Sequence, residues 1–448
     1  MFYLQRVLIK WIVSMLFHNL YISKTTTVNR LLRMATLLSL SLTSFASFSQ
    51  IHAVESIDLT TAIKKSMAHH PALNQYQYQL DAQKGLETQA GVSMPPEVSL
   101  TLEDVLGTGD LQGLENAQSS LSISWVLDDD VISKRVSVES SKKEIIEIEQ
   151  QINKIDVAAQ TARYFLNTLA LQEKLKIAHQ SVQQLNKTKM QIKKRVRAGK
   201  TTETDLLRAE AELETALLQQ EDTLHEIKSA MRMLVAQWGE KNLQPFKING
   251  SLQTELNLIT LNELEQKLVT APALKRFMVL KGIAQTKIDL AQEESKALWK
   301  VSAGLKRYEA SGDFGLTAGV TVPIMQANRN QGFIVALTAE QNQQQSEFNA
   351  LQKHVETQLF ILYQELKHAQ HVKEALQEKI IPSLNKALNE ATRVYLQGKY
   401  GYMELTSVQR DLLKAKAKLI DANLMMHLKM IELEKLTGMQ LTRFEERK

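Results

Sequence analysis

Residues 145–185 read IIEIEQQINKIDVAAQTARYFLNTLALQEKLKIAHQSVQQL, and this stretch decides the fold. Its apolar side chains recur at intervals of three and four, at Ile145, Ile148, Ile152, Ile155, Ala159, Ala162, Leu166 and Leu169, and then shift register to Leu171, Leu175, Ala178, Val182 and Leu185. A seam with such a stutter is typical of a helix that packs along its length in a coiled coil. No glycine occurs between Gly113 and Gly199, so we predict one helix over roughly 131–197 that reaches roughly 100 Å.

The rest of the chain is equally poor in turn-forming residues. Its 448 residues include 17 glycines and 7 prolines, and aromatic residues make up 6%. This composition predicts a mainly α-helical protein. A second long helix is predicted over roughly 333–397, with a kink near 379–381 because Pro382 removes a backbone hydrogen bond and clashes with the preceding turn.

The same order of features occurs twice along the chain. Ile57-Asp58-Leu59, Pro71-Ala72-Leu73, Gly199-Lys200, Asp205-Leu206 and Trp238-Gly239 correspond to Ile259-Thr260-Leu261, Pro272-Ala273-Leu274, Gly398-Lys399, Glu404-Leu405 and Thr437-Gly438. The offset stays between 199 and 202 residues, which identifies an internal repeat. Each half is predicted to hold a helix, two strands, a very long helix, a tight turn and a returning helix.

Two segments in each half alternate with period two and are predicted to be strands, at about 97–106, 119–127, 299–308 and 314–324. One face is apolar and the other small and polar, as in a transmembrane barrel, and the lengths suffice to cross a bilayer when tilted. Two soluble hairpins, each packed on a helix, remain the alternative. Four strands cannot close a barrel, and open edges cannot face lipid, so the membrane interpretation requires an oligomer with eight strands (a dimer) or twelve (a trimer).

The first 49 residues have the features of a secretory presequence. Arg30 and Arg33 precede an apolar stretch at 37–45 and small residues at 46–49, so we predict a signal peptide cleaved near Ser49 or Ala53. A membrane anchor at 7–21 is the alternative, although Lys10 interrupts it. The net charge of +5 comes from this segment, since beyond it basic and acidic residues are equal in number. The mature chain therefore has no basic surplus for binding nucleic acid.

The residue types that carry catalysis do not form a recognisable pattern. The absence of cysteine excludes disulfides, thiolate metal sites and a cysteine nucleophile. His69-His70 lacks a third ligand at helical spacing. The acids Glu203, Asp205, Glu210 and Glu212 occupy successive faces of a helix start, and Asp128–Asp130 are expected to cap the long helix. We therefore predict no enzyme activity, no cofactor and no metal site.

Taken together, the paired openings, the paired turns and Val320-Thr321-Val322-Pro323 resemble the TolC-like outer-membrane efflux family over nearly all of the mature chain. The resemblance implies long helical hairpins that form an α-barrel, and a homotrimer whose four strands per protomer build a twelve-stranded barrel in outer-membrane lipid. It also implies a periplasmic adaptor and an inner-membrane resistance-nodulation-division-type pump as partners. The expected organisation is a presequence (1–49), repeat 1 (54–239), a linker (240–258), repeat 2 (259–438) and a C-terminal tail (439–448).

A narrower resemblance is to the heavy-metal branch of that family, the CzcC-like and CusC-like channels. It rests on residues 103–110, 304–309 and 328–332, whereas residues 128–135 and the missing N-terminal cysteine depart from the branch. The expected function is a passive outer-membrane conduit for heavy-metal cations with a large periplasmic portion. Alternatives are a drug or protein exporter of the same fold, and a periplasmic coiled-coil adaptor, although an adaptor would carry flanking all-β domains.

The two turns between long helices are the candidate functional site. Both long helices descend from the strands, so their far ends should form the periplasmic tip. The residues assigned to the tip and to adaptor docking are Gly199, Lys200, Asp205, Leu206, Gly398, Lys399, Glu404 and Leu405. By resemblance, the gate candidates are Asp205, Tyr395, Tyr400 and Glu404, with Tyr400 where some members have an arginine. A plain helical hairpin is the alternative.

Overall fold

The computed structural model describes residues 55–240, 246–253, 259–324 and 329–439. The predicted presequence lies outside these residues, as do 241–245 and 254–258 of the predicted linker and 440–448 of the predicted tail. The first half contains β1 (Glu55–Ile57), α3 (Leu59–His69), α4 (Pro71–Ala90), β2 (Glu97–Glu103), β3 (Gln118–Leu127), α5 (Asp129–Arg197), α6 (Glu203–Val235) and β4 (Phe246–Ile248). The second half contains α7 (Leu261–Leu268), α8 (Pro272–Glu294), β5 (Trp299–Tyr308), β6 (Phe314–Thr321), α9 (Gln331–Glu374), α10 (Ile381–Leu396) and α11 (Tyr402–Thr437). This mainly helical fold with a small β part is the predicted class.

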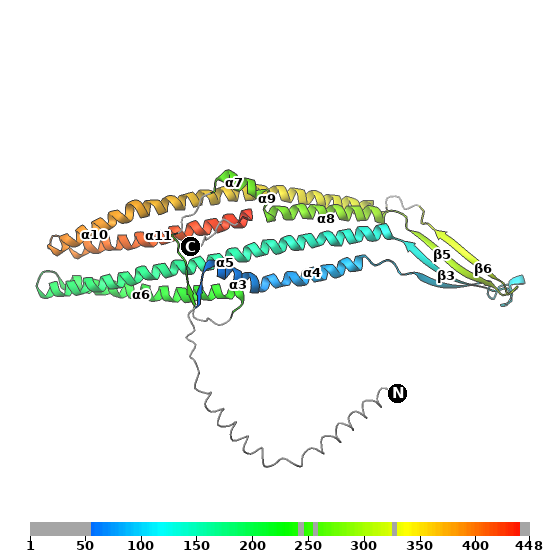
Figure 1. The fold of residues 1–448 in the computed structure, drawn as a ribbon, viewed down its shortest axis with the longest axis horizontal. Helices are drawn as coiled ribbons and strands as arrows, with labels where there is room; N and C mark the ends of the chain where they lie inside the picture. The colour runs from blue at the N-terminus through cyan, green and yellow to red at the C-terminus, as the bar shows by residue number, and fades with distance from the viewer. Residues whose placement is uncertain (1–54, 241–245, 254–258, 325–328, 440–448) are drawn as a thin grey trace, which may run out of the picture. The chain divides into compact units, whose positions relative to one another are not determined.

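Long helices lie side by side between the strands and the two turns (Figure 1). Next to the strands, α5 packs between α4 and α8, and α8 packs on α9. Next to the turns, α5 packs between α6 and α11, and α11 packs on α10. The strands therefore lie at one end of the helices and both turns at the other.

The second long helix is interrupted where proline was expected to disturb it. A π-helical turn, Ala375–Ile380, separates α9 from α10, and Pro382 follows at the start of α10. Proline has no N–H to donate to the preceding turn, and the wider π turn resets the hydrogen-bond ladder around it. The predicted single helix over 333–397 is therefore two α-helices joined by a π turn.

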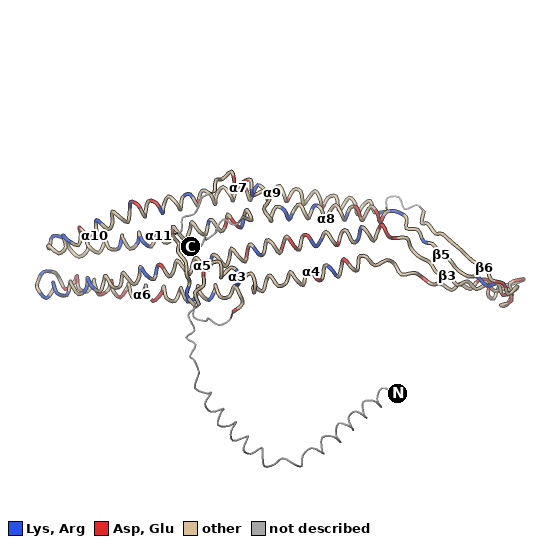
Figure 2. The backbone as a smooth tube through the Cα atoms, viewed as in Figure 1, with Lys and Arg blue, Asp and Glu red and all other residues tan. Residues whose placement is uncertain are grey.

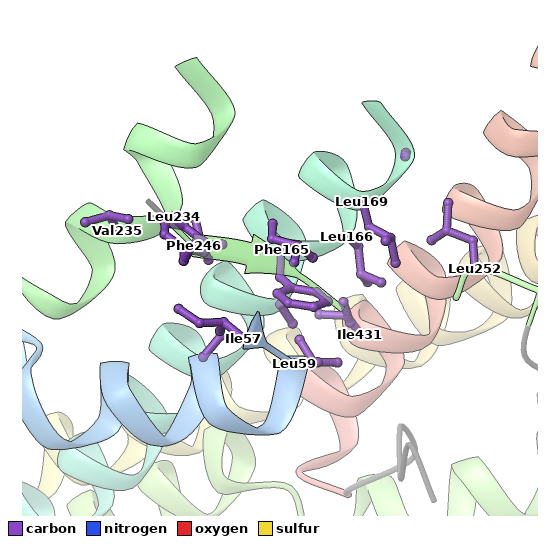
Figure 3. Packing of buried hydrophobic residues seen from close by; sticks show 14 of the residues in the cluster. Ile57, Leu59, Phe165, Leu166, Leu169, Leu234, Val235, Phe246, Leu252 and Ile431 are labelled. Carbon is purple, nitrogen blue, oxygen red and sulfur yellow. The ribbon is translucent and has the colours of Figure 1, made fainter. Parts of the chain in front are cut away.

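A buried apolar cluster lies where α3, α5, α6 and α11 meet (Figure 3). Phe165 and Leu166 of α5 lie in this cluster together with Ile57 of β1, Phe246 of β4 and Ile431 of α11, and Leu166 is 0% exposed. β1 pairs with β4, and the Asn249 N–H donates to the Ile57 carbonyl at 2.9 Å. The segment predicted only as a linker therefore contributes a strand to the core.

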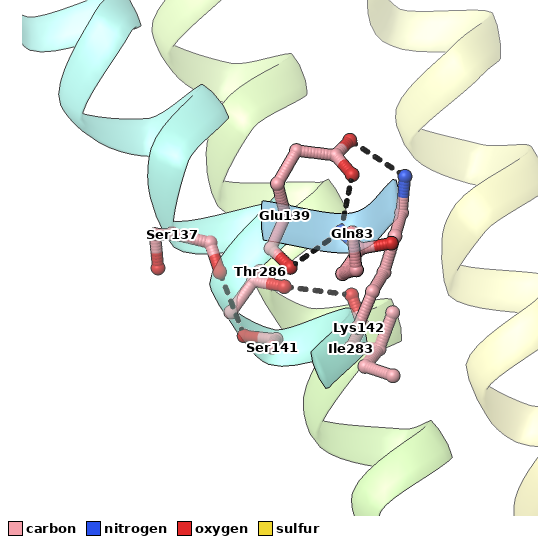
Figure 4. Close-up of polar contacts among 7 residues, drawn as sticks. All are labelled: Gln83, Ser137, Glu139, Ser141, Lys142, Ile283 and Thr286. Atoms are coloured by element: carbon pink, nitrogen blue, oxygen red, sulfur yellow. Dashed lines mark hydrogen bonds and ion pairs between the residues drawn. The ribbon is translucent and has the colours of Figure 1, made fainter. Parts of the chain in front are cut away.

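A network of side-chain hydrogen bonds joins α4 to the N-terminal part of α5, next to the strands (Figure 4). The buried Gln83 amide donates to the backbone carbonyl of Glu139 at 2.8 Å and to its carboxylate at 2.9 Å, and Lys142 donates to the same carboxylate at 2.6 Å. Burial raises the pKa of Glu139, but the bonds from Lys142 and Gln83 outweigh it and leave that pKa below its usual value. Satisfied in this way, the buried amide fixes α4 against α5.

Asp128 does not cap α5 as expected. It occupies the N-cap position, but its carboxylate accepts no bond from the first turn of α5 and instead accepts the Met94 N–H at 3.3 Å. Asp129 and Asp130 do lie in the first turn, where their charge complements the helix dipole. The buried Asp128 therefore connects the segment that leads into β2 to the start of α5.

The four strands form one antiparallel sheet in the order β2-β3-β5-β6, so the two halves of the repeat join through β3 and β5. β2 ends at Glu103, before the predicted 106, because Asp104 and Leu106 have φ of 56° and 59° and leave the extended conformation. β6 ends at Thr321, before the predicted 324, near Pro323, which has no N–H for the ladder.

Among the described residues, no helix covers the apolar face of the sheet. Val98 is 69% exposed, Phe314 61% and Leu316 91%. The alternative of two separate hairpins, each packed on a helix, is therefore wrong. Within the residues described, no helix is both long and apolar enough to cross a bilayer.

Candidate helical tip

We call the two turns and the helix ends beside them, residues 192–212 and 391–410, the helical tip. Both turns have the same backbone hydrogen bonds. The Gly199 N–H donates to the Val196 carbonyl at 2.9 Å and the Lys200 N–H to the Arg195 carbonyl at 2.8 Å. In the second turn Gly398 donates to Tyr395 at 2.9 Å and Lys399 to Val394 at 3.2 Å.

This pair of bonds is the Schellman arrangement, which requires a left-handed residue after the helix. Gly199 and Gly398 supply it, with φ of 66° and 76°. The two glycines thus end α5 and α10 in the same way.

The returning helices begin differently. In the first turn, the Thr202 hydroxyl accepts the Asp205 N–H at 3.3 Å, and the Thr201 hydroxyl donates to the Asp205 carboxylate at 2.6 Å. In the second turn, Gly401 occupies the N-cap position and offers no side chain, and an exposed Glu404 lies over it. Side-chain hydrogen bonds therefore fix the start of α6 in the first turn, whereas the start of α11 in the second turn has no side-chain cap.

Hydrogen bonding keeps Asp205 ionised. The bond from the Thr201 hydroxyl, which outweighs the effect of burial, holds the pKa of Asp205 below its usual value. A depressed carboxyl pKa stabilises the folded turn above the unfolded pKa of about 4, and this contribution is lost as the pH falls through the lower folded-state value. The turn therefore keeps the full contribution at neutral pH.

An apolar cluster joins the two turns, although they are about 200 residues apart in sequence. Its buried members are Ile192, Leu206, Ala209, Ala391, Tyr395, Tyr402 and Leu405. Leu206 and Leu405, both predicted tip residues, lie in this cluster and face the opposite hairpin. The tip is thus one packed unit of two hairpins.

Arg195 makes the first polar link between the hairpins. Its guanidinium lies 4.8 Å from the centre of the Tyr395 ring and donates to the Leu396 carbonyl at 3.3 Å. Tyr395 is 2% exposed, and burial raises the pKa of its hydroxyl, which has no hydrogen-bond partner within the described residues. Arg195 therefore holds the end of α10 through both a ring face and a backbone acceptor.

Glu212 makes the second link. The buried Tyr402 hydroxyl donates to one oxygen of the Glu212 carboxylate at 2.7 Å, and Arg410 donates to the other at 3.1 Å. Burial, followed by the bond to Glu212, raises the pKa of Tyr402 far above its usual value, so the tyrosine stays neutral and donates at every physiological pH. Glu212 of α6 thereby binds two residues of α11.

The structure separates the candidate residues into two groups. Asp205, Leu206, Tyr395 and Leu405 lie in or beside the packed cluster, but Tyr395 and Asp205 share no hydrogen bond. Lys200, Lys399, Tyr400 and Glu404 are exposed, and within the described residues no hydrogen bond or ion pair joins them to the opposite hairpin.

The sequence assigned no role in the tip to Arg195, Tyr402 or Arg410, and it placed Glu212 among the acids at a helix start, where negative charge complements the helix dipole. One signal was present, because the apolar seam Leu405–Leu412 extends backwards by three residues to Tyr402. The partner of Tyr402 had no such signal.

Metal sites in a chain without cysteine are built from histidine and carboxylate residues whose side chains lie together. Among the residues that the structure describes, no three His, Asp or Glu side chains lie together as metal ligands would. His70 caps α4, and its Nδ1 accepts the Ala72 N–H at 3.2 Å.

Comparison with known proteins assigns this architecture to a family. The family described as outer membrane efflux protein matches residues 62–240 and 287–439. The cobalt-zinc-cadmium resistance protein CzcC of Cupriavidus metallidurans is 24% identical over 340 residues, covering 76% of this chain and 80% of CzcC. The cation efflux system protein CusC of Escherichia coli K12 is 22% identical over 291 residues, covering 60% of each chain.

A solved structure has the same fold. The outer membrane protein VceC of Vibrio cholerae superposes with a TM-score of 0.66 at 16% identity, covering 85% of this chain and 96% of VceC. The matched family spans both halves of the repeat, including the helical tip and all four strands of the antiparallel sheet, β2, β3, β5 and β6. The chain belongs to the outer membrane efflux protein family.

Proposed function

We propose that this protein is the outer-membrane channel of a tripartite efflux system and passively conducts heavy-metal cations out of the cell. In this proposal, it is exported by its presequence, forms a homotrimer, and receives its cargo through a periplasmic adaptor from an inner-membrane pump of the resistance-nodulation-division type. The chain contributes a conduit and no catalysis.

The four-stranded sheet is the observation that carries the proposal. Within the described part of the chain, its outer strands, β2 and β6, each pair with one strand and present a free edge, and its apolar face is exposed. Unpaired backbone groups in lipid cost several kcal/mol each, so the edges need further strands. Three copies supply twelve strands, enough to enclose a lumen wider than the side-chain-filled interior of a barrel with about eight.

The cargo is proposed from the relatives. CzcC is named for resistance to cobalt, zinc and cadmium, and CusC for cation efflux. At these identities the same fold also suits a drug or protein exporter, and the test below separates the classes. A periplasmic adaptor without a pore is disfavoured, because the family match covers most of both halves.

The helical tip is proposed as the adaptor-docking end and the gate. Gly199, Lys200, Gly398 and Lys399 form its outer surface, and Asp205, Tyr395, Tyr400 and Glu404 are the proposed gate residues. The links from Arg195 and Glu212 support a gate that opens by separating the two hairpins at the helical tip, since they are the polar contacts between the hairpins within the tip residues 192–212 and 391–410.

Deleting the gene is expected to sensitise cells to cobalt, zinc, cadmium, copper or silver, because cargo delivered by the pump would lack an exit. Growth across a concentration series of each salt, with and without a plasmid copy, measures this. Unchanged metal tolerance together with new sensitivity to dyes and detergents would instead indicate the drug-exporting class.

Replacing Asp205 and Glu404 together by alanine is expected to raise single-channel conductance in planar bilayers. The change removes the hydrogen bond from the Thr201 hydroxyl to the charged Asp205 carboxylate, worth about 1.5–3 kcal/mol, and loosens the first turn of α6. The exposed Glu210→Ala variant is the control, since that acid lies outside the packed cluster. Unaltered conductance in the double variant would exclude these two acids from the gate.

A further inference from the structure

The polar face of the four-stranded sheet carries few charges, and all of them are paired. Within β2, β3, β5 and β6, which are described throughout, the charged residues are Glu97, Glu103, Lys300, Lys306 and Arg307. The first four alternate onto the face that also presents serine, threonine and glycine. Arg307 lies on the apolar face and pairs with Glu309 beyond the strand. Figure 2 shows lysine and arginine in blue and aspartate and glutamate in red along the backbone.

Each ion pair joins β5 to β2 across the intervening strand β3. Lys306 of β5 donates to the Glu103 carboxylate of β2 at 2.6 Å, across β3, and Lys300 pairs with Glu97 in the same direction. The residue of β3 opposite Lys306 is Ser120, whose small side chain leaves room for the lysine to cross. The Lys306 ammonium also lies 5.7 Å from the centre of the Tyr308 ring. The positions of both lysines are thus set by the register of three strands.

A gain in folding stability does not explain why these two ion pairs are present. Solvent-exposed ion pairs contribute about 0–1 kcal/mol, and hydroxyl residues would fill the same polar face. The main effect of the pairs is on charge. Each lysine neutralises one carboxylate on the polar face of the sheet, which would otherwise be negatively charged. An uncompensated ring of carboxylates would attract and retain divalent cations, whereas conduction requires weak binding.

We propose that Lys300 and Lys306 are selectivity-determining residues that neutralise Glu97 and Glu103 on the wall of the conduit, so that cations pass without being held there. This inference rests on the proposed function, in which the polar face lines the lumen. In a trimer, each pair recurs three times, so breaking one pair exposes three like charges at one level of the pore.

The test is the permeability ratio of K⁺ to Cl⁻, obtained from reversal potentials of the purified full-length protein in planar bilayers under a KCl gradient. Lys306→Gln is expected to raise the ratio by about two- to threefold, the size expected for three unit charges acting over about one Debye length in water. Glu103→Gln is expected to lower it by a similar factor. The double variant should return to the ratio of the unchanged protein, because both members of the pair are then neutral.

Arg307→Gln is the matched control, because it removes a positive charge from the next residue on the opposite face and should leave the ratio unchanged. Lys300→Gln and Glu97→Gln repeat the test at the second level, so a folding defect in one variant does not decide the outcome. Channels whose ratio is the same in all single variants would overturn this inference alone. A protein that conducts no ions would overturn the proposed function and this inference with it.

Discussion

Replacing Gly199 or Gly398 by proline is expected to abolish efflux while trimers still assemble in the outer membrane. The two glycines have φ of 66° and 76°, whereas the proline ring fixes φ near −65°. Proline also removes the N–H that closes each Schellman turn on the Val196 or Tyr395 carbonyl. The turn must then rearrange, and the packed cluster between the hairpins moves with it. Complementation of a deletion strain on inhibitory metal measures efflux, and unheated gels of membrane extracts measure assembly.

The matched controls are Gly199→Asn and Gly398→Asn. Asparagine tolerates the left-handed conformation and keeps its N–H, so these variants should retain efflux. If the proline variants also retain full efflux, both turns are plain connections, and their assignment to docking and gating is wrong.

Replacing Tyr402 by alanine is expected to lower stability and to produce a leaky channel. The side chain is 2% exposed and holds Glu212 at 2.7 Å, so its loss empties the centre of the tip and leaves Glu212 bonded to Arg410 alone. Truncating a buried aromatic side chain costs about 3–5 kcal/mol. Tyr402→Phe keeps the ring and loses only a hydrogen bond to a charged group, which costs about 1.5–3 kcal/mol. The expected order of stability is therefore the unchanged protein, then Tyr402→Phe, then Tyr402→Ala.

Thermal unfolding midpoints in detergent and single-channel conductance measure the two effects. Met403→Ala, at an exposed neighbouring position, should leave both unchanged. Equal midpoints for the alanine and phenylalanine variants would mean that packing at Tyr402 contributes nothing beyond its hydroxyl. If the Tyr402→Ala channel has the same single-channel conductance as the unchanged protein, the contact between the two hairpins at the helical tip plays no part in gating.

Local features of the fold could be predicted because their physical causes are local. The three-and-four spacing of apolar residues over 145–185 determines α5, since a helix repeats every 3.6 residues or so. Strict alternation determines the four strands, and the glycine positions determine where α5 and α10 end. The offset of 199–202 residues predicts two equivalent halves from the sequence alone. From the sequence alone, the class of fold and the two turns were therefore accessible.

Contacts between distant residues were decided only by the tertiary structure. β3 pairs with β5 to join the halves, β4 of the predicted linker pairs with β1, and Asp128 bonds to Met94 and leaves its own helix uncapped. In the tip, the partners of Arg195 and Tyr402 lie about 200 residues away in sequence. Periodicity specifies which face of an element is apolar, but it does not specify which polar side chains meet across a packed interface. That choice depends on the axial register of one helix or strand against another, which only the packing of the whole chain sets.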